Sequence, residues 1–138
     1  MRQNTKSVGD LAELKIASDL IEQGYVVSAP YGDNAPYDLI VDINGVLKKV
    51  QVKARTVKND VVTVELKSSM RNYTRQYSKQ DWDIIAIYNI DNGTIAYLDW
   101  NAIGDIKTTL TLRTVRPKNN QKSMMFEEYR FIPRCAER

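Results

Sequence analysis

The hydrophobic positions of the chain follow a helical period first and a strand period afterwards. Apolar residues recur every three or four positions near the N-terminus, which predicts a helix over about residues 8–23. Ser7 and Asp10 have the spacing of a capping box at its start, and Gly24 is a typical stop signal at its end. The residues that set the period are Leu11, Leu14, Ala17, Ser18 and Ile21.

Short β-rich runs separated by turn formers fill most of the remaining chain. Asn44-Gly45 predicts a tight type I′ hairpin turn, and Asp91-Asn92-Gly93 predicts a second hairpin. The predicted strands cover residues 25–29, 37–43, 46–55, 61–66, 82–90, 94–98 and 108–115, with a helical turn at 100–106 and an element of undecided type at 124–132. This order predicts an α+β fold, a mixed β-sheet with the N-terminal helix packed on it, in a single domain of residues 1–138.

The Asn44-Gly45 turn also predicts the register of the first hairpin. A two-residue loop makes its flanking residues direct neighbours, which places Asp38 opposite Gln51 if no bulge intervenes. Because side chains alternate between the two faces of a strand, Asp38, Gln51 and Lys53 are expected on one face. The opposite face is apolar and is predicted to belong to the core: Leu39, Val41, Ile43, Val46, Val50 and Val52.

The composition narrows the chemistry that the chain can perform. It contains no histidine and one cysteine, Cys135. Histidine-dependent catalysis, histidine- or thiolate-ligated zinc and an intrachain disulfide are therefore excluded, which leaves carboxylates, lysine, hydroxyls, amides or an oxygen-bound metal. The lone cysteine, the absence of a signal-like N-terminus and the absence of a long uncharged stretch predict a cytoplasmic protein without membrane contact.

The net charge of +3 conceals an alternation of charge along the chain. Residues 1–45 carry a net charge of −4, residues 46–80 +7, residues 81–112 −4 and residues 113–138 +4. This pattern is typical of a basic surface beside an acidic pocket, and a polyanion such as nucleic acid would explain the basic surface. A mixed, solvated surface is the other explanation of the same pattern.

The predicted cluster at the first hairpin has a chemical use. The Asp38 carboxylate and the Gln51 amide oxygen are ligands that suit Mg²⁺, and Lys53 could position a water molecule near a phosphate. Taken alone, the cluster is better explained by a cross-strand Asp–Lys pair beside a glutamine, facing water.

The order of these residues resembles the PD-(D/E)xK nuclease signature. Pro36-Tyr37-Asp38 and Gln51-Val52-Lys53 stand in the order of its two motif halves, and Glu13 lies in a helical segment ahead of them. Residues 31–39 and 50–54 are more closely similar to the PD-(D/E)xK homing endonucleases of cyanobacterial group I introns, and archaeal Holliday junction resolvases share the same order. Two residues depart from the pattern: Tyr37 splits the expected Pro-Asp, and Gln51 stands where a second acid is expected.

The resemblance implies a restriction-endonuclease-like core and roles for the individual residues. Asp38 would be the principal Mg²⁺ ligand, joined by the Gln51 side chain and the backbone carbonyl of Val52. Lys53 would orient the attacking water and stabilise charge on the phosphate, and Glu13 would complete the pocket. The reaction implied is hydrolysis of a phosphodiester, leaving a 5′-phosphate and a 3′-hydroxyl. For Glu13, the alternative is an ordinary exposed helix residue.

Two basic segments are candidates for contact with double-stranded DNA. The first, a polar stretch over residues 67–79, contains Lys67, Arg71, Tyr73, Arg75, Tyr77 and Lys79. In a helix its four basic residues would form one stripe, whereas in a loop their spacing has no meaning. The second segment contains Arg113, Arg116, Lys118 and Lys122, together with Asn119, Asn120 and Gln121.

The leading hypothesis is a Mg²⁺-dependent, sequence-specific DNA endonuclease of the homing type that makes a double-strand break in a long target site. One predicted site per chain implies at least a homodimer, and the resembling homing endonucleases suggest a tetramer. Two alternatives stay open. A Holliday junction resolvase would cut four-way junctions, and a catalytically inactive DNA-binding module would retain the fold without the activity, which the glutamine at position 51 permits.

Overall fold

The computed structural model describes residues 4–69, 74–106, 108–119 and 121–133. Its N-terminal helix α1 (Thr5–Glu22) begins three residues before the predicted start. Asn4 is the N-cap, and its side chain accepts a hydrogen bond from the Ser7 N–H at 2.8 Å. The predicted capping box is therefore wrong, because Ser7 lies inside the first turn, where its backbone donates to the cap. The predicted stop at Gly24 agrees with the observed end of the helix and with the positive φ of that residue.

The face that α1 buries differs from the residues that set its sequence period. Ala12, Ile16 and Leu20 are fully buried against the sheet, whereas Leu14 and Ile21 are 70% and 59% exposed. The helix carries apolar residues on more than one side, so periodicity alone could not decide which side packs.

A five-stranded mixed sheet forms the centre of the fold, in the order β1-β2-β3-β7-β8. Its strands are β1 (Val26–Ser28), β2 (Leu39–Ile43), β3 (Val46–Arg55), β7 (Ile84–Asn89) and β8 (Ile95–Asp99). The β3–β7 pair is parallel and all other pairs are antiparallel, which confirms the predicted mixed sheet and α+β class. The predicted hairpin register is confirmed from Ile43↔Val46 to Leu39↔Val50, and Asn44 and Gly45 both have the positive φ that a type I′ turn requires.

Two smaller two-stranded sheets complete the architecture. One pairs β4 (Val61–Glu65) with β9 (Thr109–Arg113), and the other pairs β5 (Lys67–Ser69) with β6 (Thr74–Gln76). The predicted turn after β8 is the short helix α2 (Trp100–Ile103). Residues 124–132 form neither a long strand nor an α-helix, since Met125 makes one bridge to Arg113 and a 3₁₀ turn, η1, follows at Phe126–Tyr129.

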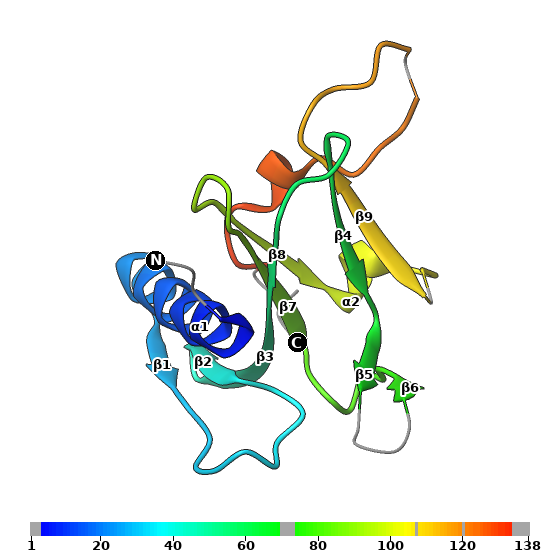
Figure 1. The fold of residues 1–138 in the computed structure, drawn as a ribbon. Coiled ribbons are helices and arrows are strands. Elements are labelled where there is room, and N and C mark those ends of the chain that lie inside the picture. Colours follow the sequence, from blue (N-terminus) through cyan, green and yellow to red (C-terminus); the bar gives the residue numbers. More distant parts are fainter. Residues whose placement is uncertain (1–3, 70–73, 107, 120, 134–138) are drawn as a thin grey trace.

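The central sheet is covered on both faces, with α1 on one side and β4 and β9 on the other (Figure 1). β7 shows this arrangement directly: Ile84 and Ala86 pack toward α1, and Ile85 and Ile87 pack toward β4 and β9. The apolar face predicted for the first hairpin lies in the α1 core, except that Val46 is only half-buried. Among the described residues, no helix is long and apolar enough to cross a membrane.

Candidate active site

Asp38 lies just before β2, where the pairing of β2 with β3 ends. β2 pairs with Val46–Val50 only, so the remaining residues of β3, up to Arg55, extend beyond it. The Asp38 N–H donates to the Val50 carbonyl at 2.8 Å, one residue short of the predicted Gln51, and its Oδ2 accepts from the Val52 N–H at 2.8 Å. The carboxylate thus binds the strand where β2 no longer supplies a backbone partner, which fixes its position.

Gln51 and Lys53 alternate with the buried Val50 and Val52, as predicted, and both are half-buried. They pair with Ile85 and Ile87 of β7, so their side chains point toward the β4–β9 side of the sheet. The Gln51 Nε2 donates to the Val52 carbonyl at 3.3 Å. The amide nitrogen of Gln51 is therefore turned to the backbone, which leaves the amide oxygen as the side-chain atom that could bind a metal.

Lys53 is a half-buried cation without an ion-pair partner among the described residues. The ion pairs found there are Lys67–Glu65 and Arg75–Asp81, so the simple Asp38–Lys53 pair is not formed. The Lys53 Nζ lies 5.4 Å from the centroid of the Tyr77 ring. Burial lowers the pKa of Lys53, the charge of Arg55 lowers it further, and the charges of Asp38 and Glu65 oppose this shift.

α1 and β3 line a common pocket, whose walls include Gly9, Val52 and Lys53, and Glu13 is half-buried one turn after Gly9 on α1. Burial raises its pKa to about 6, and the negative charges of Asp38 and Asp10 add to that shift. The pKa of Asp38 is also raised, by burial, against the opposing effects of the Val52 hydrogen bond and the Lys53 charge. The charge of Asp38 thus acts on the pKa of both Glu13 and Lys53, although Glu13 comes from the other side of the sheet.

The donor set of this pocket fits a hard divalent cation. It offers two carboxylates, an amide oxygen and the Val52 backbone carbonyl, which are oxygen ligands of the kind that Mg²⁺ prefers. Burial raises the pKa of both carboxylates, and a bound cation would stabilise their charged forms. In the described part of the chain, no three acidic, cysteine or histidine side chains converge on one point, so the amide and the carbonyl would have to complete the set.

The first basic segment does not form the helical stripe that its spacing allowed. Lys67 pairs with Glu65 at 3.3 Å on the surface, and Lys79 is exposed in a turn. Arg75 binds Asp81 through two hydrogen bonds, and Tyr77 packs on Trp82. Arg71 and Tyr73 lie outside the described residues.

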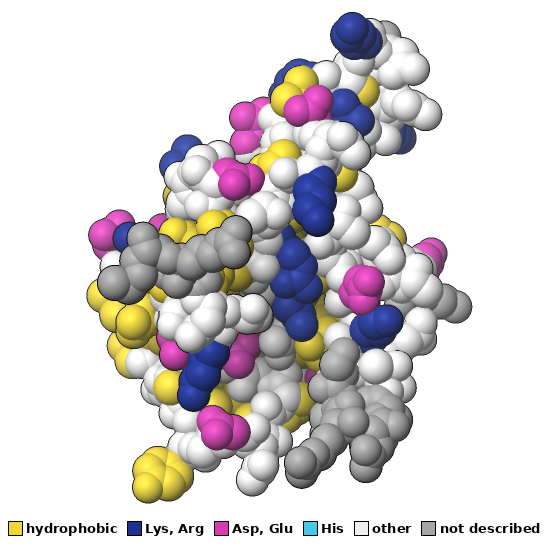
Figure 2. All heavy atoms as spheres, in the orientation of Figure 1, with side chains coloured by type: hydrophobic (Ala, Val, Ile, Leu, Met, Phe, Trp, Pro, Cys, Tyr) yellow, Lys and Arg dark blue, Asp and Glu magenta, His cyan; other side chains and the backbone are white. Residues whose placement is uncertain are grey.

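The second basic segment is mostly free at the surface. Arg113, at the end of β9, donates from its Nε to the Val115 carbonyl at 2.9 Å. Arg116, Lys118 and Asn119 are exposed on the segment that follows, as are Gln121 and Lys122, while Asn120 lies outside the described residues. Figure 2 shows Lys and Arg side chains over this segment and further ones gathered over β3, between α1 and β4.

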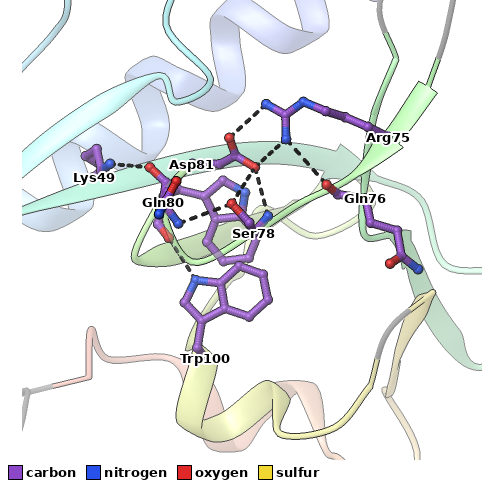
Figure 3. Close-up of polar contacts among 8 residues, drawn as sticks. Lys49, Arg75, Gln76, Ser78, Gln80, Asp81 and Trp100 are labelled. Atoms are coloured by element: carbon purple, nitrogen blue, oxygen red, sulfur yellow. Dashed lines mark hydrogen bonds and ion pairs between the residues drawn. The ribbon is translucent and has the colours of Figure 1, made fainter.

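The hydrogen bonds of Asp81 with Arg75 and Ser78, which we call the Asp81 latch, flank Tyr77 in the chain and were not predicted from the sequence. Asp81, only 6% exposed, accepts hydrogen bonds from Arg75 and from the Ser78 N–H, and Trp100 donates to the Trp82 carbonyl (Figure 3). The Ser78–Asp81 spacing, typical of a capped turn, is the one local signal for it. Trp82 is fully buried in the core between the central sheet and β4 and β9.

Comparison with known proteins agrees with this geometry. A family model described as PD-(D/E)XK endonuclease matches residues 3–132. The solved structure of a bacterial homing endonuclease, I-Ssp6803I, superposes with a TM-score of 0.73 at 26% sequence identity, covering 93% of this chain and 89% of that one. No curated protein matches the chain significantly. The resemblance drawn from Asp38, Gln51, Val52 and Lys53 is thereby confirmed at the level of family and fold.

Proposed function

Because the chain belongs to the PD-(D/E)XK endonuclease family, we propose that it is a Mg²⁺-dependent DNA endonuclease of the homing type, which makes a double-strand break in a long target site. The observation that carries this proposal is the position of Asp38, whose carboxylate binds the Val52 N–H where β3 extends beyond β2, next in the strand to the half-buried Lys53. Two desolvated carboxylates beside a lysine are the groups needed to hold a cation and to contact a phosphate.

Each residue of the pocket has a distinct role in this proposal. Asp38, fixed by the Val52 N–H, and Glu13 supply the negative charge that holds the cation. The Gln51 amide oxygen and the Val52 carbonyl add neutral ligands. When bound, Mg²⁺ would favour deprotonation of the attacking water and neutralise charge that develops on the phosphate. Lys53 would donate to the phosphate and orient the water.

The proposed partner is double-stranded DNA, bound by a homodimer at least, with a tetramer as the larger assembly. The segment over residues 113–138, with its net charge of +4, contains exposed candidates for phosphate contact: Arg116, Lys118 and Asn119. Lys67 and Lys79 are the exposed candidates near β5 and β6. Arg71 and Tyr73 stay predictions, whereas Arg75 and Arg113 already make the contacts given above.

The decisive experiment compares Asp38→Ala and Lys53→Ala with the unaltered chain on DNA that carries candidate target sites. Both variants should lose cleavage in Mg²⁺ while they retain target binding in Ca²⁺. Lys15→Ala and Asp105→Ala are matched controls, since both side chains are exposed and lie outside the pocket. Full cleavage by either pocket variant would refute the proposal.

Gln51 favours one second candidate, an inactive DNA-binding module of the same fold, because a neutral amide binds Mg²⁺ more weakly than a carboxylate. If the unaltered chain binds the target but cuts neither duplex nor four-way junction, that candidate is correct. Cleavage of four-way junctions at similar rates in unrelated sequences would instead assign the chain as a junction resolvase.

A further inference from the structure

We propose that Tyr77 is a positioning residue of the nuclease site, whose ring face holds the Lys53 ammonium in place to meet the scissile phosphate. This inference rests on the proposed function, because it takes Lys53 as a catalytic residue. It also gives Tyr77 a different role from the DNA contact predicted from the sequence.

The contact between Lys53 and Tyr77 is suited to positioning a cation without neutralising it. The ammonium lies over the ring, 5.4 Å from its centroid, and no carboxylate of the described residues forms an ion pair with it. The electron-rich ring face attracts the ammonium electrostatically but contributes no full negative charge. The positive charge of Lys53 therefore stays available for a phosphate, whereas a carboxylate partner would compete with that phosphate.

The Tyr77 ring packs on Trp82, which in turn stacks on Trp100. Its centroid lies 5.4 Å from that of Trp82, with the two rings inclined at 75°, an edge-to-face arrangement. Trp82 is fully buried and stacks on Trp100 at 4.3 Å. The Trp100 Nε1 donates to the Trp82 carbonyl at 2.8 Å, which fixes the stack to the backbone.

One carboxylate, that of Asp81, binds a side chain before Tyr77 and the backbone just after it. Asp81 accepts two hydrogen bonds from Arg75, two residues before Tyr77, and one from the N–H of Ser78, the residue after it (Figure 3). The Tyr77 N–H donates to the Leu66 carbonyl at 3.1 Å. These contacts restrain Tyr77 where its ring meets the Lys53 ammonium. Tyr31, by contrast, is fully exposed.

The test compares Tyr77→Leu, which removes the ring, with Tyr77→Phe, which keeps it. Tyr77→Leu should lower kcat about tenfold, the order of a partly desolvated cation–π contact, with KM for the DNA close to wild type. Tyr77→Phe should retain most of kcat. Tyr31→Leu is the matched control, since it removes an exposed tyrosine that makes no contact with Lys53. A raised KM with unchanged kcat would assign Tyr77 to DNA contact and overturn the inference, as would an equal loss in both Tyr77 variants.

A second measurement needs neither metal nor DNA and applies even to a poorly active variant. In NMR spectra, the Lys53 ε-methylene protons should be shifted upfield by the Tyr77 ring in the unaltered chain and in Tyr77→Phe, and should lose this shift in folded Tyr77→Leu. Absence of the shift in the unaltered chain contradicts the inference. Failure of the proposed function has a separate signature, since either the unaltered chain would not cleave at all or Lys53→Ala would cleave normally, whatever the NMR shift shows for Tyr77.

Discussion

At the scale of single residues, Gln51 is where this site departs from the acidic pattern of its family. In the proposed site, Glu13 and Asp38 would supply the two negative charges, and burial already raises the pKa of both. A third carboxylate beside them would be costly without a cation, because like charges in a desolvated pocket repel. With a cation bound, the same carboxylate would be a stronger ligand than an amide.

The variant Gln51→Glu should therefore bind Mg²⁺ on the order of tenfold more tightly, which corresponds to about 1.4 kcal/mol. It should also unfold at a lower temperature than the unaltered chain in the absence of metal. Thermal unfolding across a Mg²⁺ titration measures both effects, because ligand binding to the native state raises the unfolding midpoint. Gln121→Glu, on an exposed segment, controls for added surface charge. Equal Mg²⁺ affinity in the two glutamate variants would show that position 51 does not face the cation.

The residues of the pocket differ in how far sequence could predict them. Gln51 and Lys53 follow from strand alternation, and Asp38 follows from the hairpin register to within one residue. The contact of Lys53 with Tyr77 had no local signal, because it joins β3 to a segment that returns to the site only after β4, β5 and β6. Such contacts depend on tertiary packing, which a pattern along the chain does not contain.

At the scale of elements, the start of α1 depends on one side chain. Asn4 accepts from the Ser7 N–H, so Asn4→Ala should lower the free energy of unfolding by about 1 kcal/mol. Ser7→Ala should cost clearly less, because its backbone N–H, and not its hydroxyl, makes the cap. Urea denaturation of both variants measures the difference. A larger loss in Ser7→Ala would support the capping box that the sequence predicted.

The segment between β6 and β7 depends on Asp81. Asp81→Asn removes the charge from a buried group that holds Arg75 and Ser78, so we expect a loss of about 2 kcal/mol in the free energy of unfolding. Glu65→Gln is the matched control, because it breaks the exposed Lys67 pair, and it should cost no more than about 0.5 kcal/mol. Comparable losses in the two variants, by chemical denaturation, would contradict a special role for the latch.

The same latch predicts a pH dependence of stability. The hydrogen bonds from Arg75 hold the pKa of Asp81 below its ordinary value of 3.8. Its contribution is therefore complete above the unfolded-state pKa and is lost as the pH falls through the lower pKa of the folded state. Unfolding free energies measured from neutral to acid pH should fall less in Asp81→Asn than in the unaltered chain. Parallel pH profiles would exclude this contribution.

Elements with strong local signals could be predicted, and those defined by packing could not. The Asn44-Gly45 turn and the strand at Val46–Arg55 match the prediction residue for residue. By contrast, the spacing of the basic residues in 67–79 would place them on one face of a helix, yet β5 and β6 pair as strands there. At Met125 and η1, short apolar and charged residues alternate without a clear period, so the packing on β8 and β9 decides their conformation.

At the scale of the whole molecule, the two covered faces of the central sheet explain why the pocket lies where it does. α1 fills one face and β4 and β9 fill the other, and Asp38 binds β3 at the place where this strand extends beyond its neighbour. β3 extends in this way beyond β2, at Gln51–Arg55, within the most basic block of the chain. In the proposed function, this position would set the half-buried carboxylates beside basic residues that favour a polyanion.

The proposed site occurs once in the described part of the chain, whereas the proposed double-strand break requires two phosphodiester bonds to be cut. We therefore expect unaltered and Lys53→Ala chains, refolded together, to form mixed assemblies that cut one strand only. On supercoiled plasmid with a single target, the unaltered assembly should give linear DNA, and the mixed assembly should give nicked circles. Lys15→Ala, mixed in the same way, is the control and should still give linear DNA. If chains act as independent monomers, adding Lys53→Ala chains leaves the ratio of nicked to linear product unchanged, which would contradict the proposed homodimer.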